Sequence, residues 1–406
     1  MGSNMLKILK LFLLVVAFVA LPVTASNVVE EIRTIGKASR ISIDSKVLKE
    51  NRSLLVHLPD SYSKSNKRYP VLYLLDGERH FNHAIIATQL LQKQERVPEL
   101  IIVAITNTRT WGSDGGSRQR DLGYEKENFT RYIKNEVMSY VNHNYRTTGL
   151  NTLFGHSLAG YFSASLLATQ PELFKNYIAA SPVLQDEEID IYKKILTNSS
   201  AKYIAEKSLY FTLSSEDEAR RKAVTDAFNN FVKLLTEQPP EKLNWHFEFF
   251  DNQTHSTIYY PTFFPGMTYV FKSYQAPRFS SYNQYKDFGG MQGMTAHYKK
   301  RADIYGIDKN IPEKTLLNLA RMLLNEGQTE AALQMYSKLT HDFPESARSF
   351  SGLGQVYSSM KQYHKSITAH RKAVKLGEKQ SPQWRKSRFQ SRLNKVNEKL
   401  KLLNKN

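Results

Sequence analysis

The stretch "LNTLFGHSLAGYFSASLLA", residues 150–168, places a serine between small residues at a change of pattern. An apolar run ends in "GHSLAG" (155–160), and an apolar helical pattern follows at once. This order predicts a buried strand, a sharp turn and a helix. A G-x-S-x-G turn lifts a serine hydroxyl above a sheet, and bulky neighbours would collide there. We therefore expect Ser157 to be a nucleophile, with Ala159 as a tolerated replacement for the second glycine.

Short β-rich runs alternate with helical patterns over the first two thirds of the chain. Most of these runs are apolar throughout, as parallel strands buried on both faces are, and the first two partly alternate, as in an antiparallel edge. We therefore predict an α/β domain over residues 26–277, with a mostly parallel eight-stranded sheet flanked by helices. The predicted strands are 40–45, 53–59, 70–76, 100–106, 151–155, 176–181, 208–215 and 245–250.

A nucleophilic serine needs a base, and the base needs an acid that orients it. When the serine lies on such a turn, the acid and then the histidine follow it along the chain. His255 lies in "FFDNQTHSTIYYP", in the loop after the last predicted strand. Glu216 and Asp217 follow the preceding strand. We favour Glu216 because of its longer reach, with Asp217 or a dyad of Ser157 and His255 as alternatives.

The oxyanion that forms during attack needs backbone N–H donors. Leu158 begins the predicted helix, and we expect a second donor from Gly77 or Glu78, in the loop after strand 70–76. Side chains beside these positions are pocket candidates, namely Asp76, His80 and His156. His80 and His83 could be two ligands of a metal ion, but the sequence offers no third ligand near them. We therefore predict no metal, and we predict no cofactor.

Four segments together resemble the esterase-D and enterochelin-esterase-like branch of the α/β-hydrolases. The resemblance covers residues 40–275 and implies serine ester hydrolysis, with Ser157 as the nucleophile and His255 as the base. The C-terminal part resembles a variant known in that group. The four segments are "YPVLYLLDGERHFNH" (69–83), "GHSLAG" (155–160), "LYFTLSSEDE" (209–218) and "THSTIYYPTFFPGMTYVF" (254–271).

The same family carries an Asn-Thr and Arg-Asp segment near its site. It corresponds here to residues 107–108 and to Arg120 and Asp121. The resemblance makes these last two residues further pocket candidates. The Gly/Ser-rich residues 109–119 separate the two halves, so we expect the local pocket to have its own shape.

The first 25 residues have the pattern of a secretory signal. Lys7 and Lys10 precede the apolar run "LFLLVVAFVAL", and small residues surround Ala25. The run is short for a membrane anchor. We therefore expect cleavage after Ala25 and a periplasmic or secreted protein. The chain contains no cysteine, which excludes disulfides and a thiol nucleophile.

Basic residues concentrate in the last third of the chain. Residues 278–406 hold 24 basic and 10 acidic residues, a net charge of +14, whereas residues 26–277 hold 30 and 28, a net charge of +2. This asymmetry indicates separate modules. A protein partner or an anionic surface is one interpretation, and a solvated basic face is the other. Export argues against nucleic acid as a partner.

A 34-residue period follows a Gly-, Ser- and Tyr-rich connector at residues 278–310. Units that begin at Glu313 and Ala347 carry leucine, aromatic and small residues at matching positions. This pattern resembles the tetratricopeptide repeat, which implies two helix pairs over residues 311–378. An unrelated helical bundle is the alternative.

Residues 379–406 form the last predicted segment, a basic amphipathic helix. We favour a helix that caps the array, and a helix that lies on an anionic membrane is the alternative. Its apolar stripe, at spacings of four and three residues, comprises Phe389, Leu393, Val396, Leu400 and Leu403.

The sequence thus predicts an exported serine carboxylic-ester hydrolase whose partner is a small-molecule ester. Ser157 would attack the ester carbonyl and form an acyl-enzyme, which water would then hydrolyse. Siderophores and acyl-carbohydrates are among the substrates that the resemblance implies. An acyltransferase with the same triad, or a non-catalytic scaffold that acts through the helical repeats, are the alternatives.

Overall fold

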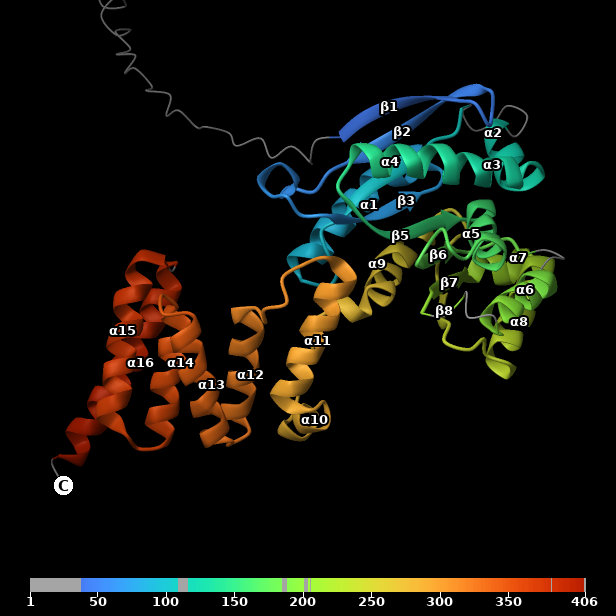
Figure 1. The fold of residues 1–406 in the computed structure, drawn as a ribbon. Coiled ribbons are helices and arrows are strands. Elements are labelled where there is room, and N and C mark those ends of the chain that lie inside the picture. Colours follow the sequence, from blue (N-terminus) through green and yellow to red (C-terminus); the bar gives the residue numbers. More distant parts are fainter. Residues whose placement is uncertain are drawn as a thin grey trace, which may run out of the picture. The chain divides into compact units, whose positions relative to one another are not determined.

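An eight-stranded sheet, in the order β1-β2-β4-β3-β5-β6-β7-β8, forms the centre of the first part of the chain (Figure 1). β2 pairs with β1 and β4 in antiparallel fashion, and the other neighbours are parallel. All eight predicted strands are confirmed. They are β1 Ala38–Ser45, β2 Glu50–His57, β3 Tyr69–Leu74, β4 Ile101–Ile105, β5 Thr147–His156, β6 Asn176–Ala180, β7 Ser208–Ser214 and β8 Asn244–Phe250.

This computed structural model describes residues 38–404, except 109–115, 185–187, 201–203, 205 and 381. The predicted signal at 1–25 lies outside the described residues. Within the described part, no helix has the length and apolar character needed to cross a bilayer.

Helices cover both faces of the sheet because its central strands are apolar on both sides (Figure 1). Val71 and Tyr73 belong to a core with α3, α5 and α8, whereas Leu72 and Leu74 belong to a core with α1 and α9. The helical segments are η1 Tyr62–Lys64, α1 Gly77–Lys93, α2 Gly116–Gln119, η2 Arg120–Tyr124, α3 Lys126–Tyr132, η3 Ile133–Val137, α4 Met138–Asn144, α5 Leu158–Thr169, α6 Glu188–Ser200, α7 Ser215–Arg220, α8 Lys222–Glu237, α9 Tyr259–Val270 and η4 Lys272–Tyr274.

The C-terminal region is entirely helical in its described residues. Two helix pairs begin at Glu313 and Ala347, the residues at which the 34-residue units begin. Their kinship to the tetratricopeptide repeat stays a prediction. The helices are α10 Tyr282–Asp287, α11 Gly290–Tyr305, α12 Glu313–Asn325, α13 Thr329–Asp342, α14 Ala347–Ser359, α15 Tyr363–Gln380 and α16 Gln383–Leu403.

The segment 278–310, interpreted from the sequence as a connector that partly packs, contains the 16-residue helix α11. Met294 and Tyr298, in its first half, join the core of the helix pairs. Tyr305, at its end, joins the core of α1 and α9 and exchanges a hydrogen bond of 2.8 Å with Ser273. The predicted connector is therefore an element of two cores.

Phe389, Leu393 and Val396, from the apolar stripe of α16, pack against other helices of the C-terminal region. Phe389 packs with Ala347 and Leu376, and Leu393 and Val396 pack with Ile367. These contacts support the capping helix over a helix that places this face in a membrane.

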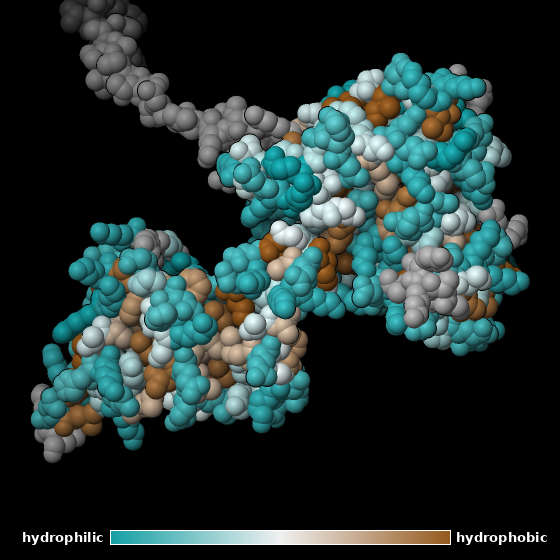
Figure 2. Space-filling model, viewed as in Figure 1, coloured by the Kyte–Doolittle hydropathy of each residue, from teal (hydrophilic) through white to brown (hydrophobic). Residues whose placement is uncertain are grey.

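Figure 2 shows a mostly hydrophilic visible surface, in which hydrophobic residues form separate patches.

Candidate active site

Ser157 lies on the sharp turn between β5, which ends at His156, and α5, which begins at Leu158. Its φ of 61° and ψ of −120° fall in a region that non-glycine residues rarely adopt. The N–H of Ser157 donates to the Ala180 carbonyl over 2.9 Å, which holds the strained turn against β6. Strain of this kind concentrates at functional sites and supports the predicted turn.

The small residues around Ser157 are required by close backbone contacts. A Cβ at Gly155 would overlap the carbonyl oxygen of Ala159, the second residue of α5. A Cβ at Gly160 would lie 3.2 Å from the Ala180 carbonyl oxygen. Ala159 itself is fully buried in the core, so its methyl group fits.

The predicted base lies beside the predicted nucleophile. Nε2 of His255 is 2.8 Å from Oγ of Ser157, and Nδ1 of His255 is 3.0 Å from a carboxylate oxygen of Asp217. Since a carboxylate only accepts, Nδ1 carries the proton and Nε2 accepts from the serine hydroxyl. Three residues from separate segments of the chain thus form one chain of hydrogen bonds.

The preference for Glu216 as the acid was wrong, and the alternative, Asp217, contacts the imidazole. Glu216 accepts instead from the backbone N–H of His255 over 2.8 Å. The alternation of side-chain directions expected of a strand does not reach Glu216 and Asp217, because Ser214 caps α7 and accepts a hydrogen bond from the N–H of Asp217. That first helical turn directs Asp217 inward, where its side chain is fully buried.

Asp217 is held in its ionised form. Burial raises the pKa of Asp217, but hydrogen bonds from His255 and Ser214, together with the charge on His255, outweigh it and hold that pKa well below its usual range. A buried carboxylate at Nδ1 favours the tautomer described above and stabilises the imidazolium ion once it forms. The site can therefore accept a proton from Ser157.

His156 supports the loop that carries His255. Its Nε2 donates to the His255 carbonyl over 2.7 Å. Burial and the charge on His255 lower the pKa of His156 to about 3, so its ring is neutral. Because the carbonyl can only accept, this neutral ring carries its proton on Nε2.

His80, another pocket candidate, is a packing residue in this structure. It is fully buried, and its ring centroid lies 4.6 Å from Tyr259 and 5.3 Å from His83. Neither of its ring nitrogens has a hydrogen-bond partner among the described residues. In that same part of the chain, no group of three potential metal ligands converges.

The expected oxyanion donors begin two helices. Leu158 is the first residue of α5, and Gly77 and Glu78 begin α1, so their N–H groups have no partner within those helices. A Cβ at Gly77 would lie 2.8 Å from the backbone of Ala104, so glycine lets this turn press against β4. The donors stay predictions, since no substrate defines where the oxyanion lies.

Asp76 connects the Gly77 turn to the Ser157 turn. Arg118 donates to both carboxylate oxygens of Asp76, over 2.8 and 2.9 Å, and also to the His156 carbonyl over 3.2 Å. Asn107 donates to the same carboxylate over 2.9 Å. The sequence analysis missed Arg118, which lies in the Gly/Ser-rich stretch and carries no motif of its own.

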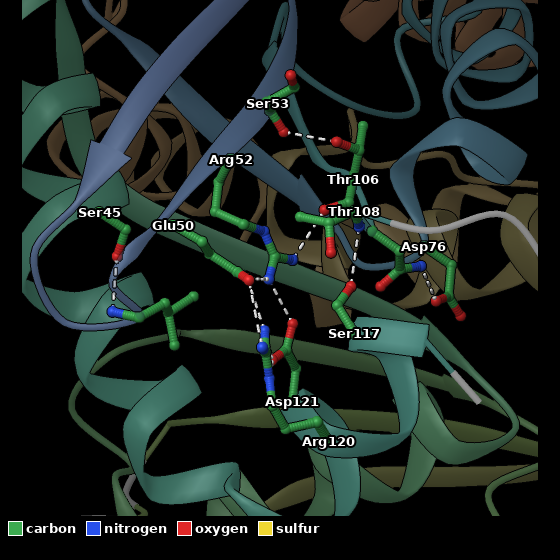
Figure 3. A network of polar contacts seen from close by, with 12 residues as sticks. Ser45, Glu50, Arg52, Ser53, Asp76, Thr106, Thr108, Ser117, Arg120 and Asp121 are labelled. Atoms are coloured by element: carbon green, nitrogen blue, oxygen red, sulfur yellow. Dashed lines mark hydrogen bonds and ion pairs between the residues drawn. The ribbon is translucent and has the colours of Figure 1, made fainter. Parts of the chain in front are cut away.

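Arg120 and Asp121 form a structural network with β2 (Figure 3). The buried guanidinium of Arg52 donates to Asp121 and to the Thr106 carbonyl, and Glu50 accepts from Arg120. Asp121 is almost completely buried there. These two pocket candidates therefore anchor η2 to β2, the second strand of the sheet.

Arg221 is a second residue that the sequence analysis missed. One of its terminal nitrogens lies 3.2 Å from each ring nitrogen of His255 and 3.3 Å from Asp217. Arg221 follows Asp217 by four residues, the spacing of an ion pair on a helix. This spacing could have predicted from the sequence that the two side chains lie close together.

Comparisons with known proteins agree with this geometry. Residues 45–231 match a family model described as "Putative esterase". Over these residues, which are less than half of the chain, the protein is similar to esterases. It is 31% identical over 153 residues to the ferri-bacillibactin esterase BesA of Bacillus subtilis, which covers 31% of this chain and 52% of that protein. An uncharacterised B. subtilis protein, YjcH, is 30% identical over 159 residues, 37% of this chain and 63% of that protein. The chain thus spans only about half to three fifths of the length of these relatives.

Solved structures share the fold. An IroE-like serine hydrolase from Shewanella oneidensis aligns with a TM-score of 0.55 at 23% identity, over 76% of this chain and all of that one. An uncharacterised protein from Capnocytophaga ochracea aligns with a TM-score of 0.59 at 14% identity, over 89% of this chain and 99% of that one. The second alignment is long enough to include helices beyond the sheet.

Proposed function

We propose that this protein is a serine carboxylic-ester hydrolase that acts through Ser157, His255 and Asp217. The observation that carries the proposal is the chain of contacts from Ser157 Oγ through the His255 ring to Asp217. The strained turn at Ser157 and the ionised Asp217 support it. The similarity to an esterase over 153 residues agrees with the same reaction class.

In the first half-reaction, Ser157 Oγ bonds to the ester carbonyl carbon as its proton moves to Nε2 of His255. Backbone N–H groups of Leu158 and of Gly77 or Glu78 receive the oxyanion. The tetrahedral intermediate collapses, and the leaving alcohol takes the proton from His255. Asp217 stabilises the imidazolium between these two steps.

In the second half-reaction, His255 takes a proton from water, and the resulting hydroxide attacks the acyl carbon. Collapse then releases the acid and returns the proton to Ser157. Every proton transfer uses the same nitrogen, Nε2, which is the ring nitrogen that faces the serine.

The test is covalent labelling. A fluorophosphonate probe should label the full chain on Ser157, and Ser157→Ala should abolish both the label and the hydrolysis of p-nitrophenyl acetate. Ser256→Ala removes an exposed serine beside His255 and should keep both. Persistent labelling of Ser157→Ala, or a wild-type chain that hydrolyses no ester, contradicts the proposal.

The substrate and the location belong to the same proposal. A relative is named for a siderophore ester, so catecholate siderophore esters are the first substrates to compare with acylated sugars and simple aryl esters. We propose export from the pattern of residues 1–25. Cell fractionation, with N-terminal sequencing of the mature chain, tests whether Ser26 is its first residue.

A further inference from the structure

A groove lies in the C-terminal helical region, between α12, α14 and α16, with Tyr336 of α13 in its wall. It encloses about 450 Å³ and involves no residue of the catalytic site. We call it the arginine groove, because its lining contains Arg321, Arg348, Arg385, Arg388 and Arg392.

The basic residues that line the groove are all arginines. Residues 278–406 contain 8 arginines and 16 lysines, yet five of those arginines and none of those lysines line it. None of its twelve lining residues is acidic. Lysine would serve as well for solubility alone, whereas a planar guanidinium binds a carboxylate through two parallel hydrogen bonds.

The positive charges are concentrated and poorly compensated. Arg348 pairs with Glu313 over 3.0 Å, and Arg392 donates to the Ser351 hydroxyl over 2.7 Å. Neither Arg321 nor Arg388 has an ion-pair partner among the described residues. Burial, and then the charges of Arg388 and Arg321, lower the pKa of Arg392. Converging cations of this kind favour an anionic ligand.

The walls add groups that suit a peptide. Asn325 and Gln355 present side-chain amides in the same lining, and such amides can bond to a peptide N–H and C=O. Gly352 lets α14 pack closely against α13, because a Cβ there would overlap the ring of Tyr336. The groove therefore offers carboxylate partners along its length and backbone partners between them.

We propose that the arginine groove binds an acidic peptide segment of a partner protein, with glutamate or aspartate side chains paired to Arg321, Arg388 and Arg392. A membrane surface fits less well, because the arginines line a concave cavity and Phe389, Leu393 and Val396 of the apolar stripe of α16 are buried against α14 and α15. The proposal is independent of ester hydrolysis, since it uses none of the catalytic residues.

The experiment measures binding of a fluorescein-labelled peptide of alternating glutamate and serine to the full chain by fluorescence anisotropy. A peptide with glutamine in place of glutamate is the ligand control. Arg321→Gln with Arg388→Gln should weaken binding by about tenfold or more, because charge-assisted bonds are lost. Lys395→Gln with Lys399→Gln removes the same charge from α16 at positions that do not line the groove, and it should change affinity less than about twofold because these lysines would not pair directly with the peptide.

A second pair of variants, Arg321→Lys with Arg388→Lys, separates geometry from charge. It should lose a large part of the affinity although the net charge is unchanged. Equal losses in the groove and control variants, full affinity in the lysine pair, or no binding of the glutamate peptide would each overturn the proposal. Binding of phosphatidylglycerol vesicles without peptide binding would replace it with a membrane site. Circular dichroism confirms that every variant is folded.

Discussion

At the scale of single residues, Asp217 and Glu216 make different contacts with His255 and should have different effects on catalysis. Asp217→Asn leaves the side chain in place but removes the charge that stabilises the imidazolium and favours the Nδ1–H tautomer. We expect kcat to fall by about 10³ to 10⁴ with little change in KM, as in other triads. Steady-state kinetics on p-nitrophenyl acetate measure this.

Glu216→Gln is the matched variant, because it also replaces one carboxylate by an amide. Its amide oxygen can still accept from the backbone N–H of His255, so kcat should fall by less than about tenfold. If Glu216→Gln lost as much as Asp217→Asn, the position of the backbone rather than the charge at Nδ1 would control the rate.

The sequence contained a signal for the acid that contacts the His255 ring. Serine followed by an acidic residue three positions later is a helix-capping pattern, and Ser214 and Asp217 make that contact through the side-chain hydroxyl and the N–H. Alternation along a strand predicts opposite directions for Glu216 and Asp217 but does not say which one points inward. The serine and the histidine were predictable because each is tied to its own motif, whereas the acid depends on where one helix begins.

At the scale of one element, α1 buries His80 and should thereby make stability depend on pH. Burial, and then the neighbouring His83, His156, Arg79 and Arg118, lower the pKa of His80 far below its ordinary value. The unfolded chain binds a proton below about pH 6.5 that the folded chain does not bind. Folding therefore loses stability as the pH falls, by about 1.4 kcal/mol per unit for this group.

His80→Phe removes that proton and fills a similar volume without unpaired nitrogens. The free energy of unfolding of His80→Phe minus that of the wild type should be about 2 kcal/mol larger at pH 5 than at pH 7.5. Urea titrations at both pH values measure the difference. His143→Gln, at an exposed site on α4, should show no such trend. A constant difference between His80→Phe and the wild type at the two pH values would show that His80 is not held neutral.

Elements were predictable where one face or both faces were uniformly apolar. Every strand of the sheet meets that condition or lies at its antiparallel edge, and all eight were found. Two irregularities left no such trace in the sequence. The helical stretch from α3 to α4 contains the π-helical segment η3, and α7 and α8 are separated at Arg221.

At the scale of the whole molecule, α11 places its buried side chains in two different cores. Met294 and Tyr298 face the helix pairs, whereas Tyr305 faces α1 and α9. The buried residues Met294, Tyr298, Arg301 and Tyr305 share one helix face at spacings of four and three, but one of them is charged, and Gly290 and Gly293 lower the intrinsic helix propensity of α11. The boundary expected at 277 thus divides residues that pack together.

The last prediction follows from that boundary. A chain that ends at Pro277 loses Tyr305, and with it the hydrogen bond to Ser273 and the ring contact with Tyr274 at 5.2 Å. A chain that ends at Asp308 keeps these contacts while it loses all the helices that follow. Both should hydrolyse p-nitrophenyl acetate at 25 °C, because neither removes a catalytic residue. Loss of a buried aromatic side chain costs about 3 kcal/mol, which corresponds to a Tm lower by roughly 5 to 10 °C.

The readout is the temperature at which half of the esterase activity survives a fixed incubation, since it reports the hydrolase part alone. The shorter chain should lose activity at the lower temperature, and Tyr305→Ala in the full chain should reproduce most of that loss. Tyr298→Ala is the matched control, because the same side chain is removed from the other core. If both truncated chains resisted heat equally, α11 would be a linker after all, and the boundary at 277 would stand.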